Sequence, residues 1–144
     1  MKIAVFVSGR GSNLNAILNY PELKNLIEIV TVVSDKIDCK AFETAKEFGI
    51  LTLTVGDGEG RIPQNSITAT LKNLEVNFIV LAGYLKLIPN DLIEIFENRI
   101  INIHPALLPS FGGKGMYGIN VHRAVFNSSA KVSGATVHMV DTTY

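Results

Sequence analysis

Short apolar runs that alternate with helix-like segments most limit how this chain can fold. Six stretches have the length and composition of buried strands, at residues 3–7, 27–33, 51–55, 78–82, 100–103 and 134–140. Segments with apolar residues at helical spacing lie between them, at residues 12–20, 38–49, 67–74, 89–96 and 118–127. This alternation predicts a Rossmann-like α/β fold, a mostly parallel twisted sheet with right-handed crossovers and helices on both faces.

Polar residues, glycine and proline indicate where the first two helices begin and end. Ser12 is expected to cap the first helix, which stops at Pro21. Asp38 is expected to cap the second helix, and Gly49 to end it. Ligands of such sheets bind at the carboxyl ends of the strands. The loops that follow the strands, at residues 8–13, 34–38, 83–89 and 104–117, are therefore the places to look for a site.

Composition narrows the class of protein. The 144 residues are 47% hydrophobic and carry 13 basic and 13 acidic side chains. This suits a single domain over residues 1–144 and argues against a basic nucleic-acid surface. Cys39 is the single cysteine, which excludes an internal disulfide and a cysteine metal cluster. The apolar run at residues 3–7 is too short for a signal peptide or a membrane span, so we expect a cytoplasmic protein that does not bind membranes.

A glycine loop, Gly9-Arg10-Gly11-Ser12-Asn13, follows the first expected strand. Leu14 stands where a dinucleotide-binding loop has its third glycine, and no Gly-Lys-Ser/Thr phosphate loop is present. What remains is a turn that leads into a helix N-terminus, where free N–H groups favour a single anion. A tight turn capped by Ser12 without any ligand fits the same residues, and the loop alone does not decide.

Two polar residues break the apolar pattern within and directly after the expected strand at residues 100–103. Asn102 and His104 should project from one face, because side chains alternate along a strand and Pro105 keeps His104 extended. Buried parallel strands are normally apolar throughout, and breaks of this kind concentrate at functional sites. The alternative is a hydrogen-bonded polar pair inside the core. His138, on the last expected strand, lies within possible reach, but a structural histidine is the favoured interpretation there.

The chemistry available to these residues lacks a protein nucleophile. No Gly-x-Ser-x-Gly elbow occurs, Cys39 has no evident partner and is expected to be a packed thiol, and no metal-ligand spacing of histidines is present. Asn102 and His104 still suit acyl transfer when the substrate brings its own nucleophile. An amide donates to the developing oxyanion, and an imidazole donates or relays protons.

Four stretches, "VFVSGRGSNLNAIL", "FIVLAGYLKLIP", "IINIHPALLPSFGGKGMYG" and "SGATVHMVD", resemble the phosphoribosylglycinamide formyltransferases, folate-dependent enzymes of purine biosynthesis. They occur in the family's order along the whole chain. The Asn-x-His-Pro-x-Leu-Leu-Pro motif is shared by formyltransferases in general, whereas the SGRGSN loop is typical of this branch. The resemblance implies the formyltransferase fold and 10-formyltetrahydrofolate as co-substrate, with no metal.

The resemblance also assigns roles to residues. Gly11, Ser12 and Asn13 match the loop that holds the phosphate of glycinamide ribonucleotide. Asn102 matches the residue that holds the formyl oxygen, and His104 matches the catalytic histidine. The implied reaction is direct attack of the substrate amine on the formyl carbon, without an acyl-enzyme.

The folate site that the resemblance implies is an apolar slot for the pterin ring. Arg61 is a candidate for the acidic tail of the folate, by composition of its loop rather than by a secure match. The folate-site candidates together are Leu85, Lys86, Leu87, Ile88, Asn102, Arg61 and Asp141.

The chain departs from the family near its end. Asp141 matches the earlier aspartate of the family's "VHxVDxxYD" stretch, and the catalytic aspartate is expected directly after Tyr144. We therefore expect residues 1–144 to form a formyltransferase domain that lacks its C-terminal part, nearly inactive and marginally stable by itself.

Other functions share part of this pattern. A formyltetrahydrofolate hydrolase would use the same asparagine and histidine on water, normally behind an extra N-terminal domain. A methionyl-tRNA formyltransferase would have a different first loop and a basic extension. A nucleotide-binding oxidoreductase would place Asp35 or Asp38 on a ribose, and Leu14 counts against it. A non-catalytic ligand-binding module would leave the pair of Asn102 and His104 unexplained.

Overall fold

A six-stranded sheet organises the computed structural model, which describes residues 1–142. The strands stand in the order β3-β2-β1-β4-β5-β6. Strands β1 to β5 are parallel, and β6 is antiparallel to β5. The predicted mostly parallel α/β fold is confirmed. The bounds are β1 (Lys2–Val7), β2 (Glu28–Ser34), β3 (Leu51–Thr54), β4 (Phe78–Leu81), β5 (Ile100–His104) and β6 (Thr136–Met139).

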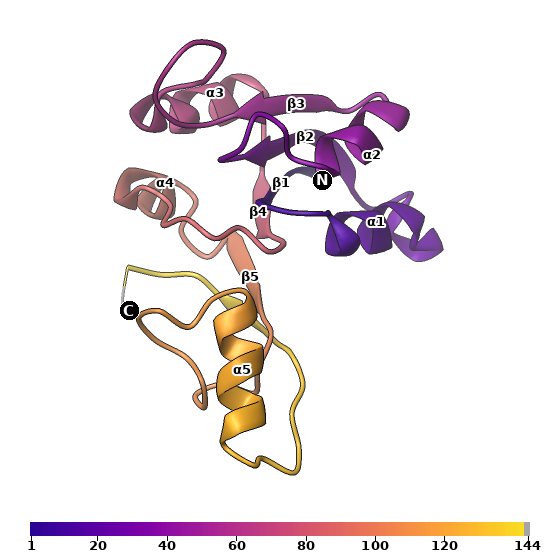
Figure 1. The fold of residues 1–144 in the computed structure, drawn as a ribbon. Coiled ribbons are helices and arrows are strands. Elements are labelled where there is room, and N and C mark those ends of the chain that lie inside the picture. The colour runs from indigo at the N-terminus through magenta and orange to yellow at the C-terminus, as the bar shows by residue number, and fades with distance from the viewer. Residues whose placement is uncertain (143–144) are drawn as a thin grey trace.

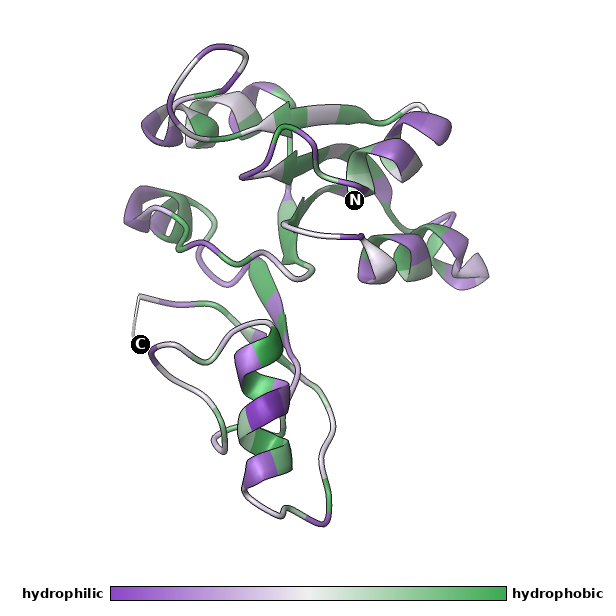
Figure 2. Ribbon diagram, in the orientation of Figure 1, coloured by the Kyte–Doolittle hydropathy of each residue, from purple (hydrophilic) through white to green (hydrophobic). Residues whose placement is uncertain are grey.

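Helices cover both faces of this sheet, with α1 and α2 on one side and α3 and α4 on the other (Figure 1). Figure 2 shows apolar residues concentrated along the strands between these layers. The helices are α1 (Ser12–Asn19), α2 (Ala41–Glu47), α3 (Ile67–Asn73), α4 (Asn90–Ile95) and α5 (Ile119–Asn127), with short 3-10 turns η1 (Pro21–Leu23) and η2 (Gln64–Ser66). No helix within residues 1–142 has both the length and the apolar character that a membrane crossing needs.

Strand β1 lies at the centre of the core because both of its faces are covered. Ala4 and Phe6 pack in the cluster under α3 and α4, whereas Val5 and Val7 pack in the cluster under α1 and α2. Each such fully buried aliphatic or aromatic side chain contributes about 1.5–3 kcal/mol relative to an exposed one. The unbroken apolar run of the sequence therefore follows from burial on two sides.

The helix starts differ from the sequence expectation. Gly11, with φ 77°, is the N-cap of α1, and Ser12 is the first helical residue with no side-chain capping bond. Helix α2 begins at Ala41, so Asp38 lies in the preceding turn and does not cap it. Both expectations were wrong because backbone contacts fix this corner: the Ala41 N–H donates to the Gly9 carbonyl over 3.2 Å.

The expected helix ends fit the structure better. Gly49 follows α2 with φ 68°, the left-handed conformation that a glycine stop requires. Helix α1 ends at Asn19, and Pro21 opens η1.

The direction of β6 departs from the parallel sheet that regular alternation suggests. The register pairs His104, at the end of β5, with Thr136, at the start of β6. The chain therefore starts β6 at the same end of the sheet at which β5 ends. Helix α5, which lies between them, projects away from the sheet instead of packing across it (Figure 1). A helix that does not cross the sheet cannot return the chain for a parallel strand.

Candidate active site at the carboxyl end of β5

The structure places Asn102 and His104 on one face of β5. Ile100, two residues before Asn102, belongs to the cluster under α3 and α4, whereas Ile101 packs against the opposite cluster. Asn102 is half-buried and His104 is buried, with 8% of its surface exposed. An amide and an imidazole thus lie two positions apart at the carboxyl end of a strand inside the sheet.

A backbone carbonyl holds the His104 ring. The Nε2 atom lies 2.9 Å from the carbonyl oxygen of Phe111, and because that oxygen only accepts, Nε2 must carry the hydrogen. Phe111 has φ 57°, a left-handed conformation that is rare for an aromatic residue. No sequence pattern pointed to Phe111, although the Gly112-Gly113 pair that follows it is a signal of a tight turn.

Thr136 joins the start of this loop to β6. Its hydroxyl donates to the Ala106 carbonyl over 2.7 Å and accepts from the Leu108 N–H over 3.0 Å. Thr136 stands directly opposite His104 in the β5–β6 ladder. Residues 104–108 are therefore tied to the last strand by one side chain that the sequence reasoning missed.

His138 contacts Asn102 directly. It stands opposite Asn102 in the register, and its Nε2 lies 3.1 Å from the Asn102 Nδ2. Its Nδ1 lies 2.9 Å from the Met139 carbonyl oxygen. The sequence favoured a structural histidine with a possible approach to the pair, and the structure shows that the approach is made.

The glycine loop lies at the carboxyl end of β1. Gly11 cannot carry a side chain, because a Cβ there would lie 2.6 Å from the Cβ of Ala41. The first N–H groups of an α-helix have no partner within the helix, which leaves this turn open to an anion. Strands β4 and β5 follow β1 in the sheet, so the carboxyl end of β1, where this turn begins, lies two strand spacings, about 10 Å, from β5.

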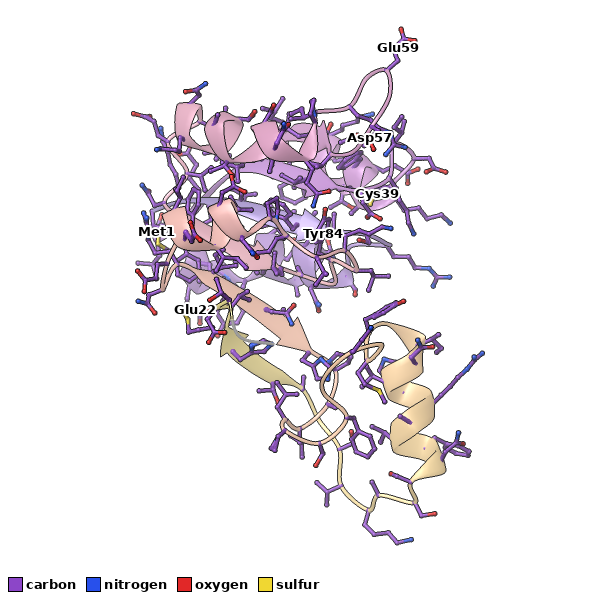
Figure 3. All side chains as sticks on the ribbon, turned by 90° about the vertical axis from the view of Figure 1, so that its left-hand side faces the viewer. Met1, Glu22, Cys39, Asp57, Glu59 and Tyr84 are labelled. Carbon is purple, nitrogen blue, oxygen red and sulfur yellow. The ribbon has the colours of Figure 1, made fainter. Side chains whose placement is uncertain are left out.

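Ser8 connects this loop to the segment after β4. The buried Ser8 donates its N–H to the Gly83 carbonyl over 3.1 Å, and its hydroxyl accepts from the Leu85 N–H over 2.9 Å. Cys39 is packed as expected, 4% exposed, with its thiol donating to the Gly9 carbonyl over 3.2 Å. Figure 3 shows Cys39 and Tyr84 on the side opposite Met1, which precedes β1.

The segment at residues 85–88 presents apolar side chains to solvent. Leu85 is 41% and Leu87 is 71% exposed, while Ile88 packs partly against the core. Lys86 is exposed between them. The Gln64 side chain donates to the Leu87 carbonyl over 3.1 Å, which brings the loop of Arg61 next to this segment.

The half-buried Asp35 lies next to the loop that carries Arg61. The Arg61 guanidinium donates to the backbone carbonyl of Asp35 over 3.0 Å, and the Asp35 Oδ1 is buried without a hydrogen-bond partner among the described residues. Burial, and secondly the negative charge of Asp35, raises the pKa of Tyr84 to about 12. The Tyr84 ring packs edge-on against Phe6, with 5.2 Å between centroids.

Asp141, possible metal ligands and an apolar hollow are the remaining features to place relative to Asn102 and His104. Asp141 is exposed and follows β6, and Tyr144, after which the catalytic aspartate is expected, lies outside the described residues. Within residues 1–142 no three His, Cys, Asp or Glu side chains converge as metal ligands would. A hollow of about 320 Å³ is lined by Ile17, Leu18, Leu23, Lys24, Ile27, Ile29, Phe48 and Ile50, around the opposite, amino ends of β2 and β3.

Comparison with known proteins finds one family along the whole chain. The formyl transferase family matches residues 1–144. The chloroplastic phosphoribosylglycinamide formyltransferase of Vigna unguiculata is 46% identical, over 99% of this chain and 47% of its own length. The phosphoribosylglycinamide formyltransferase of Bacillus subtilis is 37% identical, over 97% of this chain and 71% of its own length.

A solved structure shows the same fold. The phosphoribosylglycinamide formyltransferase of Anaplasma phagocytophilum superposes with a TM-score of 0.86 at 29% identity, over 99% of this chain and 66% of that one. The chain spans about half the length of the plant relatives that it matches. These matches, together with the fold and the pair on β5, show that the chain belongs to the formyl transferase family, in the branch of the phosphoribosylglycinamide formyltransferases.

Proposed function

We propose that this chain carries the site that transfers the formyl group of 10-formyltetrahydrofolate to the amine of glycinamide ribonucleotide. The observation that carries the proposal is the placement of Asn102 and His104 together on one face at the carboxyl end of β5. The family match supports the same chemistry. A purely structural polar pair would not need a histidine at the edge where such sheets bind their ligands.

The reaction begins when the substrate amine attacks the formyl carbon. A carbon–nitrogen bond forms, the amine passes a proton to the His104 ring, and the formyl oxygen becomes an oxyanion that the Asn102 amide and the resulting imidazolium stabilise. The bond from carbon to the folate nitrogen then breaks, and that nitrogen takes up the proton that the amine gives up. Because Nε2 of His104 donates to the Phe111 carbonyl, we assign the proton exchange to Nδ1. Loss of one such donor costs about a hundred- to a thousandfold in turnover.

The two substrates are assigned to two neighbouring surfaces. Gly11, Ser12 and Asn13 bind the phosphate of the ribonucleotide through the open N–H groups at the start of α1. The exposed apolar side chains of Leu85 and Leu87 suit the flat pterin ring.

The rest of the folate is assigned to groups around this slot. The exposed Lys86, and Arg61 from the loop whose Gln64 binds the Leu87 carbonyl, suit the acidic tail. The folate site as proposed consists of Leu85, Lys86, Leu87, Ile88, Asn102, Arg61 and Asp141.

A folate-release assay tests the proposal. A protein extended beyond Tyr144 through the expected catalytic aspartate is given 10-formyltetrahydrofolate with and without glycinamide ribonucleotide, and the folate product is followed by its absorbance. Release that depends on the ribonucleotide supports the transferase. Release without it identifies a hydrolase instead, and binding of a nicotinamide nucleotide with no release identifies an oxidoreductase.

Variants link the activity to this site. His104→Ala and Asn102→Ala are each expected to lower turnover about a hundredfold or more. His122→Ala, on the exposed surface of α5, is the matched control and should keep full turnover. A His104→Ala protein with full turnover would remove this histidine from the reaction.

The binding partners and the cellular location of this protein are predictions. Small-molecule substrates follow from the proposed reaction, and a protein that does not bind nucleic acid or membranes is still expected from the sequence. The cytoplasmic location is also an expectation, and the relatives from Vigna unguiculata and Arabidopsis thaliana are named as chloroplastic. Fractionation of cells that express a tagged protein would decide the location.

A further inference from the structure

We infer that His138 is a positioning residue that sets which end of the Asn102 amide faces the substrate. The inference rests on the proposed function, because it concerns the asparagine to which that function assigns the formyl oxygen. It concerns a third side chain, on another strand, to which the family resemblance gave no role in the reaction.

The register of β5 and β6 brings the two side chains together. Asn102 on β5 and His138 on β6 are directly opposite each other in an antiparallel pair, where side chains on the same face are close neighbours. Both are half-buried, and their nitrogens lie 3.1 Å apart. The contact therefore belongs to the ladder itself, not to a mobile loop.

One tautomer of His138 explains both of its contacts. The Asn102 Nδ2 only donates, so the His138 Nε2 must accept and carries no hydrogen. The Nδ1 then carries the hydrogen, and it donates to the Met139 carbonyl 2.9 Å away. The neutral ring with its hydrogen on Nδ1 satisfies all three groups at once. The opposite tautomer would set an N–H against an N–H at Asn102, and a lone pair against a carbonyl at Met139.

This tautomer decides the orientation of the asparagine. An amide has a donor end and an acceptor end of nearly the same shape, so packing alone does not distinguish them. With Nδ2 on His138, one amide hydrogen is used there and the second is left for the formyl oxygen. A rotation of the amide by half a turn would bring Oδ1 against the Nε2 lone pair. It would also present an acceptor where the oxyanion needs a donor.

Nuclear magnetic resonance of the nitrogen-labelled protein tests the placement without any need for activity. Long-range correlation of the His138 ring is expected to show the hydrogen on Nδ1. A coupling across the hydrogen bond is expected between Nε2 and the Asn102 Nδ2, whose signals are identified by their loss in Asn102→Asp. A hydrogen on Nε2 of the neutral ring, or an Asn102 amide signal that does not change in His138→Leu, would overturn the inference.

Kinetics test the consequence. His138→Leu is expected to lower kcat about tenfold, because one neutral hydrogen bond no longer holds the productive orientation, while KM for both substrates changes less than about twofold. His138→Gln, whose side-chain oxygen can accept from Nδ2, is expected to recover most of the loss. His122→Leu, on exposed α5, should change neither the rate nor the Asn102 signals.

The outcomes separate the two proposals. Absence of formyl transfer by the extended protein, together with the expected tautomer and coupling, would refute the function and leave the placement of His138 standing. Transfer with an unchanged kcat in a folded His138→Leu would refute the positioning role and leave the function. Circular dichroism shows whether His138→Leu folds. If it does not fold, the decision rests on the resonance data of the unaltered protein and of His138→Gln. The inference requires that His138→Gln keeps the Asn102 signals in place.

Discussion

Residues 1–104 and residues 105–142 are held in place by different forces. Every buried hydrophobic residue of the described chain except Ala106 and Val121 lies in the first region. The second region exposes apolar side chains, including Phe126 at 85% and Val132 at 75%, and its helix α5 projects from the sheet (Figure 1). Burial stabilises the first region, whereas the β5–β6 ladder and a few side-chain hydrogen bonds attach the second.

The candidate site lies on the boundary between these regions. Asn102 and His104 come from β5, which is part of the layered sheet. The groups that orient them, the Phe111 carbonyl and the His138 ring, come from the second region. The comparison indicates that the reactive side chains sit on a well-packed strand, while their orientation depends on a less buried segment.

The largest expected effect comes from truncating one aromatic side chain in each region. Phe96→Ala removes a side chain that is 1% exposed, and it should lower the free energy of unfolding by about 3–5 kcal/mol. Phe126→Ala removes one that is 85% exposed, and its effect should stay within about 0.5 kcal/mol. Urea unfolding of both variants checks this difference. Equal losses would mean that α5 is covered in solution.

A second comparison concerns two glycines of the first loop. Gly11→Ala should lower the free energy of unfolding by about 1–3 kcal/mol, because φ is 77° and the new Cβ would lie 2.6 Å from the Ala41 Cβ. Gly9→Ala is the control, since a Cβ there meets no atom within 4 Å. Its stability should change by no more than about 0.5 kcal/mol. Thermal unfolding and substrate affinity are measured on both. A stable Gly11→Ala protein would show that this corner is less tightly packed than described.

A third prediction tests the link between the regions. Thr136→Val removes the hydroxyl that binds Ala106 and Leu108, and should cost about 1 kcal/mol. Thr136→Ser keeps the hydroxyl and should lose less. Hydrogen exchange of the Leu108 amide checks the local effect. The exchange should become faster in the valine variant and stay unchanged in the serine variant. Unchanged exchange in both variants would mean that the loop is held by other contacts.

The first region was the easier one to predict from sequence. Its apolar pattern indicated every strand from β1 to β5, clearly where both faces are buried, as in β1, and more weakly in the partly exposed β3. The same-face placement of Asn102 and His104 followed from strand alternation alone.

Other features depended on contacts between distant segments. Strand β6 is antiparallel because α5 projects away from the sheet instead of crossing it. The apolar periodicity of the sequence does not show where a helix will pack. Ser12 and Asp38 looked like caps, but the contact of Gly9 with Ala41 fixes that corner through the backbone. The carbonyl of Phe111 at His104 is likewise a backbone group, and backbone groups carry no residue-specific signal.

The smallest expected effect near neutral pH is a pH dependence within the first region, because it appears only in alkaline solution. The pKa of Tyr84 is raised to about 12, first by burial and then by the charge of Asp35. A free tyrosine titrates near pH 10. Between about pH 10 and pH 12 the folded protein therefore keeps a proton that the unfolded chain has lost, and stability must fall as the pH rises through this window. The contribution of Tyr84 is fully present below about pH 10.

Two substitutions separate the causes of this shift. Tyr84→Phe keeps the ring against Phe6 and removes the phenol, so unfolding free energy should decline less steeply above about pH 10 than in the unaltered protein. Asp35→Asn removes the smaller cause, so the pKa of Tyr84 should fall but stay above its ordinary value. The ultraviolet difference between each protein and its Tyr84→Phe counterpart reports the phenolate directly. A Tyr84 that titrates at its ordinary pKa would mean that water reaches the phenol. The layered packing of the first region would then stop short of the segment that carries the proposed folate site.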